Sequence, residues 1–206
     1  MRRRPFPPRR QHGLAAVEFA LLLPFLLMLL FGMIDVARAL QANIIITNIS
    51  REGANLVARG GVQLETGSQD IMYALMASAP PLNVNQRGMM YITRVMGVVR
   101  NGVASSVVLD QYRWDDNERS LGVGASGYKP TSKVYNCTSW SSASKCSGFS
   151  SSSRPAVDTM KGKLSDGEVV HVVETFYRYD MLLTGAATTA LGLPTLGPDL
   201  YSLSVF

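Results

Sequence analysis

The longest apolar segment of the chain lies near its N-terminus. Between Leu14 and Ile34 the only ionisable residue is Glu18, and at about 1.5 Å of rise per residue a helix of this length can span a bilayer. Residues 35–59 keep a helical composition with recurring apolar positions, and Gly60-Gly61 is a natural stop for a helix. The pattern predicts a transmembrane helix over residues 14–34 and a helix extension over residues 35–60.

A second helix and a hairpin are predicted next. Residues 65–79 carry Ile71, Met72, Leu75 and Met76 on one helical face and are followed by Pro80-Pro81, which ends a helix. The β-rich segments 89–100 and 103–114 flank Asn101-Gly102. This dipeptide favours the positive φ angles of a type I′ hairpin turn.

Further strands are predicted towards the C-terminus. The β-rich segment 168–183 has two faces that both carry apolar residues, so we expect an inner strand covered at least in part on each side. Residues 200–206 could add a last strand. The fold class expected for the whole chain is α+β: a long N-terminal transmembrane helix followed by a domain, residues 61–206, with an antiparallel β-sheet.

Between these strands, residues 115–167 form a long segment rich in Ser and Gly that we expect to be a surface loop. It contains the only two cysteines, Cys137 and Cys146, which could close a disulfide in an oxidising compartment. No neighbouring His completes a zinc site with them. We therefore expect no metal and no cofactor.

Charge changes the interpretation of the N-terminus. The chain carries 20 Lys and Arg residues against 15 Asp and Glu, but the whole basic excess precedes Gly13, at Arg2, Arg3, Arg4, Arg9 and Arg10. A basic leader before an apolar helix is the positive-inside pattern, which keeps residues 1–13 in the cytoplasm and places the bulk of the chain outside. The remaining chain is formally neutral, so we do not expect a nucleic-acid partner.

The sequence contains no clear arrangement of catalytic residues. His12 lies in the leader, so a catalytic centre based on histidine would rest on His171 alone. Asp110, Asp115, Asp116 and Glu118 lack the spacing of a calcium loop, and a solvated acidic turn is the better interpretation. The aromatic group Phe176, Tyr177 and Tyr179 fits core packing better than a docking surface. We expect the protein not to be an enzyme.

The N-terminal elements together resemble a type IV-like prepilin. Gly13 is followed by four small or apolar residues and then by Glu18-Phe19, and Arg51-Glu52-Gly53-Ala54 follows the apolar helix. This arrangement is most similar to the TadE-like pseudopilins of the tight-adherence (Flp) pilus systems. The resemblance covers residues 9–60. It implies cleavage by a prepilin peptidase between Gly13 and Leu14.

The resemblance also implies a function in assembly. A minor pilin or pseudopilin would sit in the bacterial inner membrane as a single-pass protein, with other pilins and the Tad secretion machinery as partners, and would act in pilus biogenesis and surface adhesion. Glu18 would then face the new N-terminal ammonium of a neighbouring subunit and fix the stagger between helices, with Phe19 beside it. The alternative is that Glu18 lies near the cytoplasmic interface and reaches the lipid headgroups.

Two other functions remain open from the sequence. Ala37-Arg38-Ala39 has the small-x-small spacing of a signal-peptidase site, so cleavage after Ala39 would release an exported binding protein. An uncleaved chain would be a signal-anchored binding protein or enzyme of the cell envelope whose 115–167 segment carries the function. The N-terminal residue of the mature protein separates the three hypotheses.

Overall fold

The computed structural model describes residues 12–59, 64–116, 121–122, 128–148, 150, 153–182 and 197–206. The leader up to residue 11 lies outside the described residues. So do Gly60-Gly61, Glu118, Ser151 and Ser152, and the turn-rich segment 183–196.

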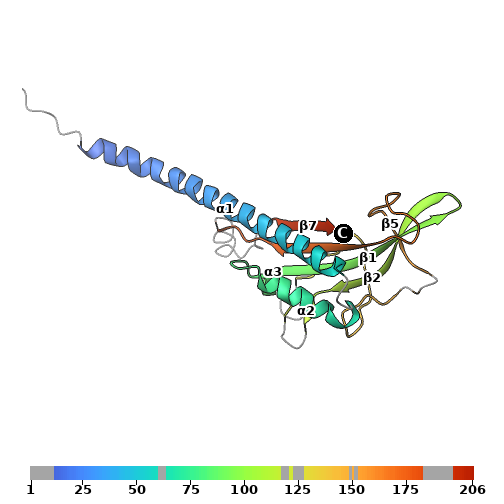
Figure 1. Ribbon diagram of the computed structural model, residues 1–206. Coiled ribbons are helices and arrows are strands. Elements are labelled where there is room, and N and C mark those ends of the chain that lie inside the picture. Colours follow the sequence, from blue (N-terminus) through green and yellow to red (C-terminus); the bar gives the residue numbers. More distant parts are fainter. Residues whose placement is uncertain are drawn as a thin grey trace, which may run out of the picture.

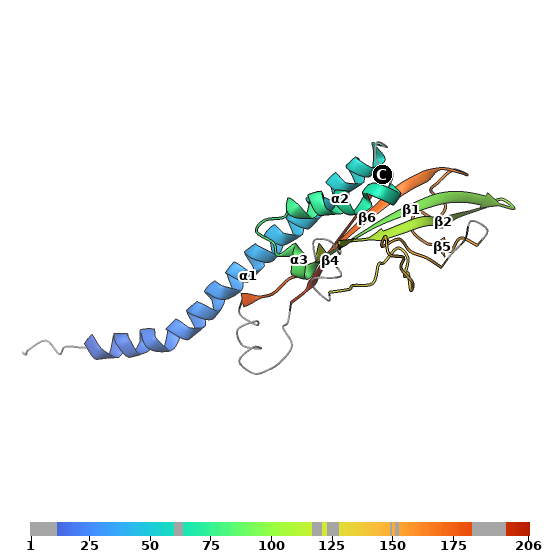
Figure 2. The ribbon, with the colours of Figure 1, turned by 90° about the horizontal axis from the view of Figure 1, so that it is seen from below.

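The N-terminal helix α1 (His12–Ala58) is continuous over 47 residues. Its first part carries exposed apolar side chains from Val17 to Phe31 and projects away from the rest of the molecule (Figure 1). Figure 2 shows this part changing direction, and Pro24 within it lacks the amide hydrogen of a regular helical bond. The second part lies on the domain and buries a stripe of side chains at helical spacing, namely Ala42, Ile46, Ile49, Ala54 and Val57.

The domain is built on a five-stranded antiparallel sheet with the strand order β5-β2-β1-β6-β7. The strands are β1 (Gly88–Arg100), β2 (Val103–Arg113), β5 (Ala156–Val157), β6 (Val169–Arg178) and β7 (Asp199–Val205). A separate two-stranded ladder joins β3 (Asp115–Asp116) to β4 (Leu121–Gly122). The predicted α+β class is confirmed, and the segment 168–183 supplies an inner strand, β6, between β1 and β7.

The turn between β1 and β2 adopts the predicted hairpin conformation. Asn101 has φ 51° and Gly102 has φ 77°, so both central residues lie in the left-handed region that a type I′ turn requires. The pairing Arg100↔Val103 follows directly from this turn, and a β-bulge between Arg94 and Val95 shifts the register further along.

Helices cover one face of the sheet. The second part of α1 packs on β6 and β7, and α2 (Leu64–Ala77) lies beside α1, as Figures 1 and 2 both show. Gly53 lies where α1 contacts both α2 and β6. A Cβ at this position would lie 3.0 Å from Leu75 Cδ1 and 3.4 Å from Val173 Cγ1. The predicted apolar face of α2 is buried here, with Met72, Leu75 and Met76 at most 2% exposed. A short helix, α3 (Val84–Arg87), leads into β1.

The opposite face of the sheet is covered by the 115–167 segment, which corrects the expectation of a plain surface loop. Val134, Val157 and Leu164 from this segment pack against Val95, Val108, Val170 and Val172 of the sheet. Residues 144–146 extend the sheet edge, because Cys146 N donates to Gln111 O and Arg113 N donates to Ser144 O. The sequence pattern did not predict this packing, because the apolar residues are few and widely spaced among the Ser residues of the segment.

Candidate functional site

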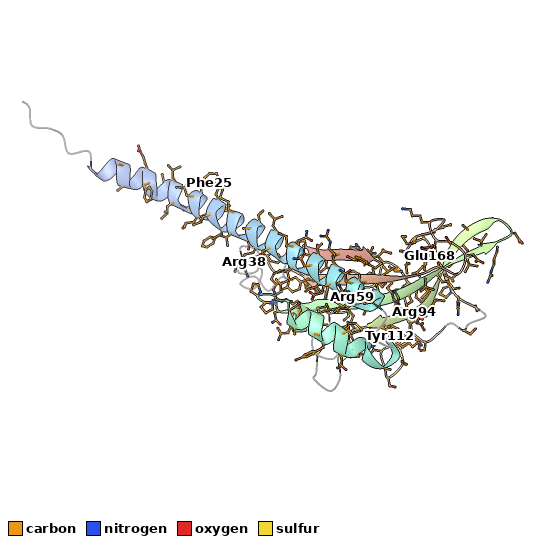
Figure 3. The ribbon with its side chains drawn as sticks, viewed as in Figure 1. Phe25, Arg38, Arg59, Arg94, Tyr112 and Glu168 are labelled. Atoms are coloured by element: carbon orange, nitrogen blue, oxygen red, sulfur yellow. A yellow bond between two sulfur atoms is a disulfide. The ribbon has the colours of Figure 1, made fainter. Side chains whose placement is uncertain are left out.

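The residues predicted to act in processing and assembly lie at the free end of α1. Gly13 is exposed, and a Cβ at this position would meet nothing within 4 Å. Leu14 lies in the same helix, and one turn further Glu18 and Phe19 are exposed, Phe19 to 58%. In the view of Figure 3, Phe25 marks this free part of α1, well apart from the domain. The Glu18 and Phe19 side chains are therefore available to other molecules.

Asp35 anchors α1 where the free part ends and the packed part begins. Its side chain is 6% exposed, and its Oδ1 accepts a hydrogen bond of 2.7 Å from Leu182 N. The backbone oxygen of Asp35 accepts a second bond of 3.2 Å from the Tyr179 hydroxyl. Burial raises the pKa of Tyr179, with the nearby Arg38 acting in the opposite direction, so the phenol stays a donor at neutral pH. Figure 3 shows Arg38 where α1 meets the domain.

An apolar groove of about 550 Å³ runs beside this anchor. It is lined by α1 between Gly32 and Asn43 and by Met181 and Leu200 from the domain. The groove places an apolar surface directly next to the free part of α1.

A buried carboxylate ties the 115–167 segment to the sheet. Glu174 on β6 is fully buried and accepts hydrogen bonds from the Ser132 hydroxyl, from Lys133 N at 2.9 Å and from the Tyr201 hydroxyl at 3.0 Å. Burial, followed by the Glu174 charge, raises the pKa of Tyr201. Gln111 extends the network, because its Nε2 lies 3.0 Å from Ser132 Oγ and 3.0 Å from Tyr135 O. The network fixes residues 132–135 against three strands.

The two cysteines lie in the same covering segment. Cys137 and Cys146 form a disulfide with a Cα–Cα distance of 5.9 Å. Between them, Trp140 packs against the Tyr91 ring at 6.0 Å, and the Arg113 guanidinium lies 4.7 Å from the Trp140 ring centroid. The structure does not bring the cysteines near Gly13 or Glu18.

Two of the acidic residues considered for a cation, Asp110 and Asp115, form separate ion pairs. Asp110 contacts Lys145 at 2.9 Å and Arg94 at 3.4 Å, while Asp115 contacts Arg113 at 3.0 Å. The expectation of a solvated acidic turn is therefore wrong for these two side chains. No group of three potential metal ligands occurs among the described residues.

His171 and the aromatic group have structural surroundings. His171 is half-buried on β6, where burial and then the Arg94 charge lower its pKa. Phe176, Tyr177 and Tyr179 are each at most 5% exposed, in agreement with core packing. Their burial leaves these three rings little surface for a partner.

Comparison with known proteins assigns the N-terminal part. Residues 13–55 match the family model described as TadE-like protein. The match covers most of α1 and none of the sheet, and it confirms the predicted resemblance over this segment. Neither the curated proteins nor the solved structures give a match.

The TadE-like segment lies in a helix that is long and apolar enough to anchor the chain in a membrane. Within the part of the chain that the structure describes, α1 is the one helix long and apolar enough to cross a membrane, and its most apolar stretch is not buried in the protein. The TadE-like segment also includes Asp35 and Gly53, so it spans both the free part of α1 and the part that packs on the domain.

Sequence reasoning missed Asp35 and Glu174. Asp35 is the first charged residue after the apolar run, and Glu174 is the one acid within β6. Both positions could have indicated a buried, hydrogen-bonded carboxylate, because a lone acid next to apolar residues requires hydrogen-bond donors when it is buried. Only the folded chain shows which donors those are.

Proposed function

We propose that the protein is a minor pilin or pseudopilin of a Flp-type (Tad) pilus, a structural subunit and not an enzyme. The observation that carries the proposal is the TadE-like match at residues 13–55, with Gly13 and Glu18 on the free part of α1. The chain would be anchored in the bacterial inner membrane with its N-terminus in the cytoplasm, because the leader holds the basic excess. Assembly into the pilus would support biogenesis and adhesion.

Processing by a prepilin peptidase would expose a new ammonium group at Leu14. The Glu18 carboxylate of a neighbouring subunit is the natural partner for this charge, since opposite charges about 4 Å apart attract by about 4 kcal/mol at an effective dielectric constant near 20. An uncompensated carboxylate in the span costs about 2.5–3.5 kcal/mol on insertion scales. Pairing would offset that cost and set the axial stagger of the helices.

The alternative of an exported protein cut after Ala39 agrees less well with the contacts of α1. Cleavage there would remove Asp35, together with the bonds from Leu182 N and the Tyr179 hydroxyl. It would also remove much of the groove lining. These contacts favour a mature chain that keeps residues 14–39.

N-terminal sequencing of the mature protein tests the processing step. We expect the sequence to begin at Leu14, and we expect Gly13→Leu to leave a protein that retains residues 1–13. Gly32→Leu is the matched control, because it places the same side chain in the same helix far from the cut and should leave cleavage unchanged. A mature chain that begins at Met1, Leu40 or Gln41, or a Gly13→Leu protein of normal mature mass, refutes this step.

Glu18→Gln tests the assembly step separately. We expect the variant to be cleaved normally but to be lost from sheared pili, because the amide cannot pair with an ammonium as a carboxylate does. Glu52→Gln is the matched control, since Glu52 is also exposed on α1 but lies outside the apolar run. Equal recovery of the Glu18→Gln protein and the wild type in the pilus fraction would exclude the registry role.

A further inference from the structure

The 115–167 segment and the sheet enclose a small polar cavity of about 130 Å³. Its walls are Tyr91 and Arg113 from the sheet, residues 129–132 and 135–137, and Trp140. The Cys137–Cys146 disulfide closes the loop that supplies one wall. We propose that this cavity binds the carboxylate group of a small organic acid or of an acidic sugar. The site lies outside the TadE-like segment and does not depend on the pilus assignment.

The charge of the walls favours an anion of one negative charge. Arg113 and Lys129 both line the cavity, and no Asp or Glu among the described residues does. Asp115 contacts Arg113 at 3.0 Å and so neutralises most of the guanidinium charge. Lys129 is exposed and has no ion pair within the described residues. The buried Glu174 carboxylate lies behind Ser132 and also acts on Tyr91, so it lowers the positive charge at this wall further. The exposed Lys129 ammonium is therefore the charged donor that a ligand meets, and a single ammonium matches a carboxylate better than a doubly charged phosphate.

The size of the cavity sets how much of the ligand can enter. Liquid water occupies about 30 Å³ per molecule, so the cavity holds roughly four waters. This space accepts a carboxylate with a few attached atoms and excludes a whole sugar ring. An acidic sugar would therefore insert its carboxylate and leave the ring at the opening.

Two hydroxyl groups of the walls are already hydrogen-bonded, and other donors stay free. The Tyr91 hydroxyl donates to Pro130 O at 2.6 Å, and the Ser132 hydroxyl donates to Glu174, so neither is available to a ligand. The side chains of Thr131 and Asn136 have no hydrogen-bond partner within the described residues and are exposed. Together with the Lys129 ammonium they supply an amide, a hydroxyl and a charged donor, the groups that a carboxylate accepts from.

Titration of the full chain in detergent micelles tests this site. Calorimetry and tryptophan fluorescence would follow binding of sodium acetate, sodium galacturonate, galactose and sodium phosphate, since Trp140 lines the cavity. We expect acetate and galacturonate to bind and galactose not to bind. Equal affinity for the two carboxylates indicates a small organic acid, whereas at least tenfold tighter binding of galacturonate indicates an acidic sugar.

Two matched variants locate the binding. We expect Lys129→Gln to weaken carboxylate binding about tenfold and Lys129→Arg to restore it, while Lys163→Gln, which removes an equally exposed charge elsewhere in the same covering segment, leaves it unchanged. The proposal is overturned if neither carboxylate binds, if galactose binds as tightly as galacturonate, if phosphate binds more tightly than both carboxylates, or if Lys129→Gln binds like the wild type.

Discussion

Replacing Glu174 by Gln removes a buried charge while keeping the side-chain shape. In the wild type one carboxylate oxygen accepts from Lys133 N at 2.9 Å and from the Tyr201 hydroxyl at 3.0 Å, and the other accepts from Ser132. The Gln oxygen can keep the first two bonds, but these become neutral. Its NH₂ group then faces a Ser132 oxygen that already lies within hydrogen-bond distance of Gln111 Nε2 and of two backbone amides.

The expected loss of stability follows from the changes in these hydrogen bonds. A hydrogen bond to a charged group contributes about 1.5–3 kcal/mol and a neutral one about 0.5–1.5 kcal/mol, and a buried donor without a partner costs about 1–3 kcal/mol. We expect Glu174→Gln to lower the free energy of unfolding by about 3–5 kcal/mol. For a chain of this size about 1 kcal/mol shifts the melting temperature by roughly 2–4 °C, so the expected fall is about 10 °C.

Thermal unfolding of the full chain in detergent micelles, followed by circular dichroism, measures this fall. Glu52→Gln is the control, because it removes an exposed carboxylate from α1 and should change the free energy of unfolding by less than about 0.5 kcal/mol. Equal melting temperatures for the Glu174→Gln and Glu52→Gln proteins would refute the reasoning. The buried network would then be replaceable by neutral groups at no cost.

Three further changes test other parts of the structure. Gly97→Ala should destabilise the domain by about 2–4 kcal/mol in the same unfolding assay, because its Cβ would overlap the Ser165 carbonyl oxygen; an unchanged melting temperature contradicts the close packing of β1. The double replacement Cys137→Ser and Cys146→Ser should lower the free energy of unfolding by about 2–3 kcal/mol through the lost loop constraint, and no difference from the oxidised wild type would show that the constraint is negligible. Burial lowers the pKa of His171, so the unfolded state binds its proton more readily below about pH 6.5. The stability advantage of the wild type over His171→Gln should therefore be largest above that pH and shrink as the pH falls to 5, and a constant or growing advantage would refute the assignment.

Local sequence signals determined the elements of this protein. The apolar run 14–34 and the helical composition that follows it predict α1, and Asn101-Gly102 predicts the β1–β2 turn, because periodicity and turn chemistry act over a few residues. The Gly13 to Phe19 pattern likewise indicated the TadE-like resemblance that the family match confirms for residues 13–55. These features need no knowledge of distant contacts.

Tertiary structure alone decided how the 115–167 segment and the buried acids are used. Glu174 meets Ser132 and Tyr201 only when β6, β7 and the covering segment come together, and Asp35 meets Leu182 only when α1 lies on the domain. The small cavity has the same origin, since its walls come from β1, β2, residues 129–136 of the covering segment and the disulfide-closed loop. The composition of a segment shows which polar groups it contains. Which distant residues hydrogen-bond to those groups depends on the tertiary packing, because a buried polar group is stable only where the fold supplies it with partners.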